Sequence, residues 1–567
     1  MRRPTLLAGA IFGGLTSLLL MAISYLGRVW VGLPFIPFDL FDWLARVLPG
    51  RVIAFGLDTM VRLITSLGLG PISSTAKRLE QLQGLLLVAG GGVILGLVVA
   101  WAMQHSSRPG PVVGAIAGAA VFALVSGIEL SLRSSVASNP LVAFVWLAFL
   151  TVGWGWLLGF LLDNPAPAAQ SQTSQAPTAI PTAFGQSRRG FFRKVGGLLT
   201  ATFAAWGLGW LIDRQSQLPA IAQGPTPTTT PSSSSLTPAS TGVPGSVSAV
   251  PPSGTPVPGS TSPVPGSITP VPSSLTPAPG TRPALTPTNE FYRIDIDTEP
   301  PVIDGNTWSL KVSGLFDAPR NLTLADLQAY PPVTEPVTMS CISNPVGGDL
   351  IGTANWKGAP LHMVLADLGL RPEAKALSIQ AADGFYESVT LADLQDPRTL
   401  LVYAMNDQPL PVPHGFPLRI YIPDRYGMKQ PKWITSIEAV AKRGNGYWVD
   451  RGWSLEARPQ IVSVIDQVTV KPENGRVPVG GIAWAGARGI RSVEVQVDGG
   501  PWNAAALITP PLGPLTWVQW RYDWPAVSGQ HTFTVRATDG TGTLQVAEVQ
   551  DVAPDGATGY DSTTVTI

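Results

Sequence analysis

Long apolar runs dominate the first 212 residues of the chain. Five of them approach the roughly 20 residues that a helix needs to cross a membrane: residues 5–26, 85–104, 111–128, 141–162 and 195–212. Glycine recurs within them, as close packing between membrane helices favours. We therefore predict an α-helical, multi-span membrane region over residues 1–212.

The segment between residues 30 and 69 is also apolar, but charged side chains interrupt it: Asp39, Asp42, Arg46, Arg51, Asp58 and Arg62. We interpret this segment as lying at the membrane surface or re-entering the membrane. A further span is the alternative.

Paired arginines precede the fifth apolar run. Residues 187–194 read Ser-Arg-Arg-Gly-Phe-Phe-Arg-Lys, which is similar to a twin-arginine export signal, although it lies inside the chain. The alternative is an ordinary anchor whose positive end stays inside the cell. Both interpretations place the chain after residue 213 outside the cytoplasmic membrane, so we expect a multi-pass protein of the cell membrane with an extracytoplasmic domain.

The composition changes after this run. Residues 215–281 carry no charged side chain, are rich in Pro, Ser, Thr and Gly, and repeat Val-Pro-Gly-Ser from Val243, Val257 and Val264. Such a segment cannot bury a core. We predict a disordered linker over residues 213–287, acting as a plain spacer or a stalk.

Two globular patterns follow the linker. Over residues 288–459, short β-patterned runs alternate with short helical ones, which favours an α+β domain; Thr323 is placed to cap one of the helices. Over residues 460–567, apolar and polar positions alternate between turns such as Asp498-Gly499 and Asp539-Gly540. This alternation is typical of an antiparallel β-sandwich.

The composition limits which partners and cofactors are expected. The 567 residues include 37 basic and 37 acidic side chains, so the balance of charge gives no reason to expect a nucleic-acid partner. The single cysteine, Cys341, excludes both an intrachain disulfide and a Cys-x-x-Cys-His haem motif. Of the 4 histidines only His105 lies near a predicted span, which disfavours a haem within the membrane. For Cys341, a buried and inert thiol is the plain alternative to a metal ligand.

Several motifs occur in order between residues 289 and 433. Asn-Glu-Phe-Tyr-Arg begins at residue 289, Cys-Ile-Ser-Asn at 341, Trp-Lys-Gly-Ala-Pro-Leu at 356, His-Gly-Phe-Pro-Leu-Arg at 414 and Tyr-Gly-Met-Lys-Gln-Pro-Lys-Trp at 426. In this order and spacing they resemble the molybdopterin-binding fold of the sulfite oxidase superfamily. The β-sandwich is similar to the immunoglobulin-like domain that follows this fold in sulfite oxidases. That resemblance implies a homodimer, with a monomeric stabilising module as the alternative.

The resemblance implies Mo-molybdopterin as the cofactor and Cys341 as its metal ligand and catalytic residue. One protein thiolate is sufficient because the pterin dithiolene supplies two further sulfurs. Arg419 and Lys432 match positions that contact phosphate and pterin, a role suited to cations. The implied cofactor-binding set is Asn289, Tyr292, Arg293, Cys341, His414, Arg419, Gln430, Pro431 and Lys432. Tyr426 and Lys429 are weaker candidates near the metal.

Two departures leave the substrate open. Sulfite oxidases line an anion pocket with arginines, whereas no arginine occurs in the six residues after Cys341. Methionine-sulfoxide reductases of this type have a threonine where this chain has Ala381. Asp383 is the nearest acid for proton transfer, with a turn-forming role beside Gly384 as the alternative.

The sequence therefore predicts a membrane-anchored molybdenum-cofactor oxidoreductase, performing a two-electron oxygen-atom transfer on a small molecule. Because no haem or flavin motif is present, electrons should pass to a separate cytochrome or quinone-linked membrane protein. The alternative is a non-catalytic, stalked binding or adhesion protein with a degenerate scaffold. A transporter has little support, because the predicted spans contain no charge pairs.

Overall fold

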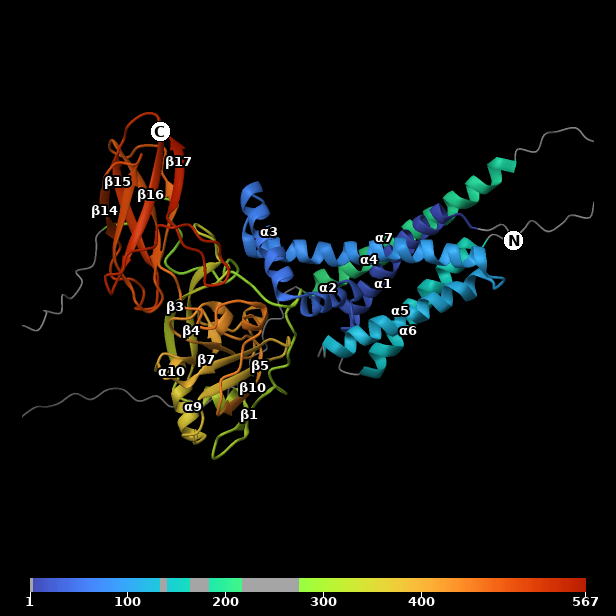
Figure 1. Ribbon diagram of the computed structural model, residues 1–567, viewed down its shortest axis with the longest axis horizontal. Helices are drawn as coiled ribbons and strands as arrows, with labels where there is room; N and C mark the ends of the chain where they lie inside the picture. Colours follow the sequence, from blue (N-terminus) through green and yellow to red (C-terminus); the bar gives the residue numbers. More distant parts are fainter. Residues whose placement is uncertain (1–3, 133–139, 164–182, 217–274) are drawn as a thin grey trace, which may run out of the picture.

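The computed structural model describes residues 4–132, 140–163, 183–216 and 275–567. In chain order these residues form a helical part, a mixed domain and a β domain (Figure 1). Of the linker predicted over residues 213–287, residues 217–274 lie outside the described residues, residues 213–216 are helical and residues 275–287 are described.

The described helical part contains α1 (Leu6–Val31), α2 (Ile36–Val47), α3 (Gly50–Leu67), α4 (Ile72–His105), α5 (Gly110–Leu132), α6 (Pro140–Leu162) and α7 (Ala183–Ser216). Five of them, α1, α4, α5, α6 and α7, are long and apolar enough to cross a membrane. They contain the five predicted apolar runs, except that Thr5, the first residue of the first run, is the N-cap of α1. The charged segment after α1 forms α2 and α3, neither of which is among the five.

Glycines bring the spans together in pairs. Helix α1 packs on α4, and α5 packs on α6. A Cβ atom added to Gly96 would collide with the carbonyl oxygen of Gly9, and one added to Gly155 would collide with that of Gly114. Because glycine has no Cβ atom, these helix backbones can come this close. The close approach adds van der Waals contacts between the paired helices.

The mixed domain holds two sheets. One has the order β2-β1-β10-β5-β6, with β1 (Ser309–Gly314) parallel to β10 (Ile434–Val440) and antiparallel to β2 (Asn321–Thr323); β5 (Ala376–Ala381) and β6 (Tyr386–Thr390) complete it. The other runs β3-β4-β7-β8, with β9 on β7. Its strands are β3 (Val333–Ser340), β4 (Ile351–Pro360), β7 (Leu400–Met405), β8 (Gln408–Pro409) and β9 (Arg419–Tyr421).

Short helices cover these sheets: α8 (Leu324–Gln328), α9 (Leu361–Asp367) and α10 (Leu391–Leu394). Thr323 caps α8 as predicted, because its hydroxyl accepts from the backbone of Asp326 and the Asp326 carboxylate accepts in return. The main apolar core lies between the first sheet and α9 and includes Leu310, Leu361 and Ile437.

The β domain is one antiparallel path in the order β11-β12-β15-β14-β13-β16-β17. Its strands are β11 (Val462–Val468), β12 (Arg476–Trp484), β13 (Ile490–Val497), β14 (Trp502–Leu507), β15 (Val518–Pro525), β16 (Gln530–Asp539) and β17 (Asp561–Thr566). The sheet curves back on itself, so that its first strand in this order, β11, also contacts β16 and β17. The enclosed core includes Val477, Trp520 and Phe533.

The segment that precedes the mixed domain in the chain already contacts the β domain. Residues 275–287 lie along it, where Arg282 forms an ion pair with Asp466 at 2.6 Å and Trp517 donates to the carbonyl of Ala284 at 3.1 Å. This short segment therefore joins the β domain before the chain enters the mixed domain.

Candidate active site

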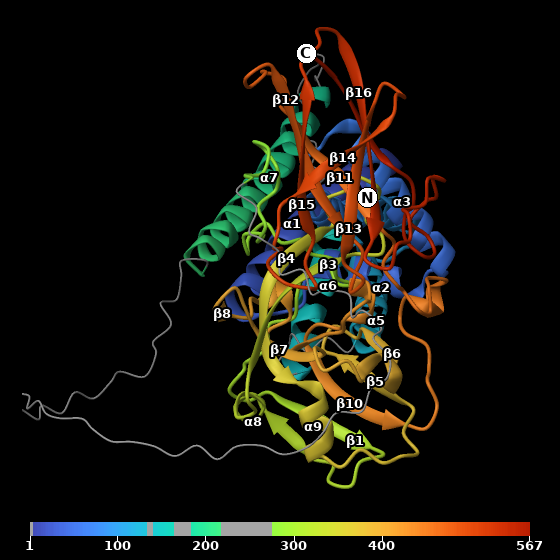
Figure 2. The same cartoon turned by 90° about the vertical axis from the view of Figure 1, so that its left-hand side faces the viewer.

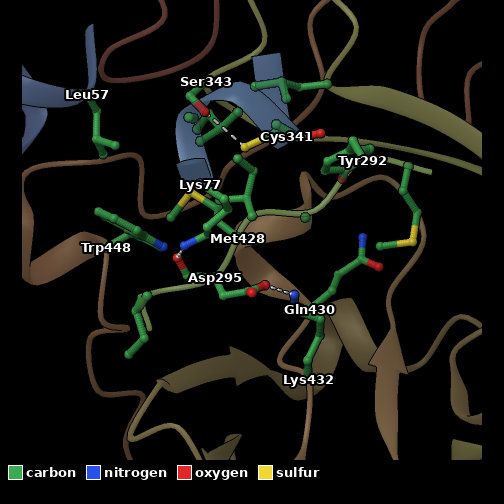
Figure 3. A pocket seen from close by; sticks show the side chains of 18 of the residues that line it. Leu57, Lys77, Tyr292, Asp295, Cys341, Ser343, Met428, Gln430, Lys432 and Trp448 are labelled. Atoms are coloured by element: carbon green, nitrogen blue, oxygen red, sulfur yellow. Dashed lines mark hydrogen bonds and ion pairs between the residues drawn. The ribbon is translucent and has the colours of Figure 1, made fainter. Parts of the chain in front are cut away.

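A cavity of about 1280 Å³, its open mouth included, lies where the helical part meets the mixed domain (Figure 3). Helices α3 and α4 form one wall. Residues 291–296, residues 341–343 after β3 and residues 427–432 before β10 contribute much of the rest. Two parts of the chain that are far apart in sequence therefore build one site.

Cys341 lies in this cavity at the end of β3. Its backbone N–H donates to the carbonyl of Leu350 at 2.9 Å, which fixes the loop, and its Sγ lies 3.0 Å from the hydroxyl of Ser343. Burial raises the pKa of the thiol, against the smaller opposing effect of the Ser343 hydrogen bonds. A protonated thiol is the resting form, and coordination to a metal would hold it as thiolate.

Most of the predicted cofactor contacts line the same cavity: Tyr292, His414, Arg419, Gln430, Pro431 and Lys432. Asn289 is exposed and Arg293 lies beside the cavity, and neither contributes to its lining. The two weaker candidates also lie outside the lining. The Tyr426 hydroxyl accepts from the backbone of Gln460 at 3.0 Å, and Lys429 forms a buried ion pair with Glu387 at 2.9 Å.

Asp295 organises the charges of the cavity, although sequence reasoning missed it. Its buried carboxylate forms ion pairs with both Lys432 and Arg293. Burial alone would raise the pKa of this carboxyl, but the nearby cations Lys432, Lys77 and Arg293 outweigh burial and lower the pKa to about 2. Burial also lowers the pKa of Lys432 to about 8, against the attraction of Asp295. No local sequence signal joins Asp295 to a lysine 137 positions away.

Arg419 is a buried cation whose Nε–H group has no hydrogen-bond partner among the described residues. Its guanidinium lies 4.8 Å from the ring centre of Trp356, and its Nη1 donates to the carbonyl of His414 at 3.1 Å. Burial lowers its pKa to about 10, so it stays charged at neutral pH. Burial, followed by the cations Lys432 and Arg419, lowers the pKa of His414 to about 3, so this imidazole is neutral.

Buried polar atoms without partners show what the cavity can accept. Within the described part of the chain, the Nε of Arg419 and the Oε1 of Gln430 have no hydrogen-bond partner although both are buried. An unmet cationic donor suits a phosphate, and an unmet amide acceptor suits a ring N–H. These residues therefore fit a pterin with a phosphate tail. Among the described residues, no three His, Cys, Asp or Glu side chains gather to hold a metal, so a metal beside Cys341 would need further ligands from the cofactor.

Comparison with known proteins fits this geometry. The family "Oxidoreductase molybdopterin binding domain" matches residues 297–448. The sulfite oxidase of Arabidopsis thaliana is 30% identical over 270 residues, which cover 38% of this chain and 68% of that protein. This chain belongs to the sulfite oxidase superfamily of molybdopterin oxidoreductases.

Other relatives match different shares of the chain. The putative protein-methionine-sulfoxide reductase subunit YedZ1 of Azospira oryzae is 32% identical over 174 residues, covering 31% of this chain and 63% of that protein. The chain spans about half of human mitochondrial sulfite oxidase, covering 52% of it at 28% identity. The solved sulfane dehydrogenase SoxCD of Paracoccus pantotrophus gives a TM-score of 0.45 at 20% identity, covering 52% of this chain and 86% of that one.

Proposed function

We propose that this superfamily member is a membrane-anchored molybdenum-cofactor oxidoreductase that transfers an oxygen atom to or from a small molecule. The observation that carries this proposal is the placement of Cys341, Arg419, Gln430 and Lys432 around one cavity. When bound, Mo-molybdopterin supplies the two-electron redox chemistry at its metal. The residues of the chain bind that cofactor, orient it and control protons.

Cys341 is the proposed metal ligand and catalytic residue. Arg419 and Lys432 are the proposed contacts of the phosphate and pterin, because both are cations in the cavity wall and Arg419 has an unmet donor. Tyr292, His414, Gln430 and Pro431 complete the binding surface. The remaining proposed contacts, Asn289 and Arg293, would act from beside the cavity, and Arg293 would do so by holding Asp295.

Asp383 is the proposed proton carrier. It lines the cavity, and its Oδ1 accepts the backbone N–H of Phe385 at 3.0 Å. Burial, together with the neighbouring charge of Asp297, raises its pKa to about 7. A carboxyl of this pKa can both hold and release a proton near neutrality, which an oxygen-atom transfer coupled to water requires.

Electrons would pass to a separate membrane partner, a cytochrome or a quinone-linked protein, since the sequence has no haem or flavin motif. We also propose that the mixed and β domains lie outside the cytoplasmic membrane. The twin-arginine-like residues 187–194 fall near the N-terminal end of α7 and overlap the start of its apolar stretch, Gly190–Ile212. The β domain, over residues 460–567, is proposed to be immunoglobulin-like and to support either a homodimer or a monomer.

The test is metal and pterin analysis of full-length protein purified from membranes in detergent. We expect about one molybdenum per chain, and turnover of an oxidised or reduced sulfur or nitrogen compound with a mediator dye. Cys341→Ser should abolish turnover while leaving the melting temperature nearly unchanged. Molybdenum-free protein, or full activity of the Cys341→Ser variant, would refute the proposal and favour a non-catalytic binding protein.

A further inference from the structure

The polar start of α4 forms part of the cavity that holds Cys341. Residues 72–84 precede the apolar run of this helix and are mostly polar. The helical part lies on one side of the mixed domain (Figures 1 and 2), and Ser73, Lys77 and Glu80 of the polar stretch line the cavity. Lys77 is only 8% exposed. The helical part therefore contributes a buried cation to the proposed cofactor site.

The ammonium group of Lys77 already has three acceptors. It donates to the Glu80 carboxylate at 2.7 Å and to the carbonyls of Asp295 and Asp297 at 3.0 Å each. These bonds use all the N–H groups that a lysine has. Lys77 is therefore placed to hold its neighbours rather than to bind a ligand.

The segment that Lys77 holds has little support from its own domain. Residues 293–299 belong to no helix or strand, and within the described part of the chain none of their backbone groups bonds to another backbone group. Side chains of the helical part hold the segment instead. Arg46 of α2 donates to the Asp297 carboxylate at 2.5 Å, whereas Lys77 of α4 reaches the backbone on both sides of residue 296.

Asp295 connects this support to Lys432. The Asp295 side chain is fully buried and forms an ion pair with Lys432, and Asp295 lies between Lys77 and Lys432 in the cavity (Figure 3). The carboxylate can stay on the Lys432 ammonium only while the backbone of Asp295 is held in place. Lys432 is in turn a cation that the proposed function assigns to the pterin and its phosphate.

Resting on the proposed function, we propose that Lys77 is a positioning residue of the cofactor site. It holds the backbone of residues 295–297, so that the Asp295 carboxylate stays on Lys432 and Lys432 stays in the cavity wall as a cation. The helical part then completes the cofactor site and does more than anchor the catalytic domain.

Two possible roles of Lys77 predict opposite effects on the pKa of Lys432. Burial lowers this pKa to about 8, while the charge of Asp295 acts to raise it. If Lys77 acted only as a nearby positive charge, its removal would relieve repulsion and raise the pKa of Lys432. If Lys77 positions Asp295, its removal weakens the ion pair and lowers the pKa of Lys432. The other charged and titratable groups that interact with Lys432 stay in place in the variants below: Asp295, Arg293, Arg419, His414, Asp383 and Cys341.

The pKa of Lys432 can be measured on the full chain, produced without cofactor and purified in detergent. Acetylation of its amine by acetic anhydride is followed against pH by mass spectrometry. The variant that combines Lys77→Met with Glu80→Gln removes the donor and leaves no unpaired carboxylate. Glu80→Gln alone is the matched control, because its amide oxygen can still accept from Lys77.

We expect the pKa of Lys432 to fall by about one unit in the double variant, as loss of an adjacent opposite charge causes, and to stay near the wild-type value in Glu80→Gln. Arg78→Met, which removes the exposed neighbouring cation of α4, should also leave it unchanged. If the double variant does not fold, Lys77→Gln, whose amide can still donate, should give a smaller shift in the same direction. An unchanged or higher pKa of Lys432 in the folded variant would overturn the proposal.

Release of molybdenum from loaded protein gives a second readout. At pH 8 the double variant should lose molybdenum about fivefold faster than Glu80→Gln, because the charged fraction of Lys432 falls from about a half to about a tenth. At pH 6 Lys432 is charged in both proteins, so the two rates should agree within about twofold. An equal difference at both pH values would mean that Lys77 supports the fold without acting on Lys432, which would also overturn the proposal.

The outcomes separate this inference from the proposed function. Wild-type protein without molybdenum refutes the proposed function, while the acetylation experiment still decides whether Lys77 positions Asp295. Loaded wild-type protein combined with an unchanged pKa of Lys432 in the double variant refutes only the role of Lys77 and leaves a molybdenum enzyme in place.

Discussion

At the scale of single residues, the sequence motifs identified groups that touch the cavity but not the groups that hold them. Cys341, His414, Arg419 and Lys432 occur in motifs and line the cavity. Asp295 and Lys77 could not be predicted, because their importance arises from partners distant in sequence: Lys432 for Asp295, and the backbone of Asp295 for Lys77. A spacing pattern carries no information about such contacts.

Asp295→Asn should strongly destabilise the mixed domain. The substitution keeps the shape of the side chain but leaves Lys432 and the partly buried Arg293 without their counter-charge, at a cost of about 3–5 kcal/mol. The pKa of Asp295 is lowered to about 2, so its stabilising contribution is present above pH ~4 and is lost as the pH falls towards 2.

Thermal unfolding in detergent between pH 3 and 7 measures this effect. Asp367→Asn is the matched control, because Asp367 pairs with Arg320 on the surface, where the two side chains are 47% and 45% exposed. The prediction fails if both variants melt at the wild-type temperature.

At the scale of elements, the apolar pattern predicted the five long apolar helices, because a helix in lipid must satisfy its own backbone and needs a long apolar run. It could not decide the structure of residues 30–69, where apolar and charged positions mix. There, contact with another domain provides the partners: α3 packs its apolar side on the cluster around Cys341, and Asp42 of α2 accepts from the backbone of Thr298 at 2.9 Å. That contact lies between residues 256 positions apart.

Two neighbouring glycines of α6 should respond differently to the same substitution. Gly155 faces the backbone of α5, whereas a Cβ at Gly153 would meet nothing within 4 Å. Gly155→Leu should therefore force α5 and α6 apart, lower the melting temperature in detergent by several degrees and reduce the yield of folded protein. Gly153→Leu should be close to wild type. Similar melting of the two variants would show that this contact does not hold the spans together.

At the scale of the whole molecule, the chain is held together by a polar interface between the helical part and the mixed domain. Arg46 donates to the Asp297 carboxylate at 2.5 Å and to the carbonyl of Asp383 at 2.7 Å. Arg28 pairs with Glu299, and the Asp349 carboxylate accepts from the first residue of α4 at 3.0 Å. Because Asp383 also lines the cavity, this docking and the architecture of the site are linked.

The association of the helical part with the mixed domain should become stronger as the pH falls. Burial, followed by the charge of Asp297, raises the pKa of Asp42 to about 7. Between its unfolded value near 4 and about 7, the docked form binds more protons than a separated one, so docking weakens as the pH rises through 7. Hydrogen exchange of residues 295–299 should be faster at pH 8 than at pH 5.5, after correction for intrinsic rates.

Asp42→Asn provides the control for this pH effect. The amide oxygen can still accept from Thr298, but the titrating group is gone, so the pH dependence of exchange should become smaller. An unchanged pH dependence would assign the effect to the other buried carboxyls of the interface, Asp297 and Asp383, whose pKa values burial also raises.

Arg46 should contribute most of the polar docking free energy, because its partners are shielded from water. Its side chain and that of Asp297 are 20% and 18% exposed, whereas Arg62 and Asp551, which join α3 to the β domain, are 67% and 70% exposed. Arg46→Met leaves the Asp297 carboxylate without its main cation and should weaken docking by about 3 kcal/mol. Arg62→Met should change it by less than about 0.5 kcal/mol, since exposed pairs gain little.

A double-mutant cycle of Arg46→Met with Asp297→Asn isolates this pair, with docking followed by hydrogen exchange of residues 295–299 and of α2. A coupling above about 1 kcal/mol is expected because the two groups are in direct contact. If Arg46→Met and Arg62→Met changed exchange equally, the interface would depend on the apolar contacts of α3 and α4 rather than on its charges. The cavity wall would then be the element that joins the membrane part to the catalytic domain.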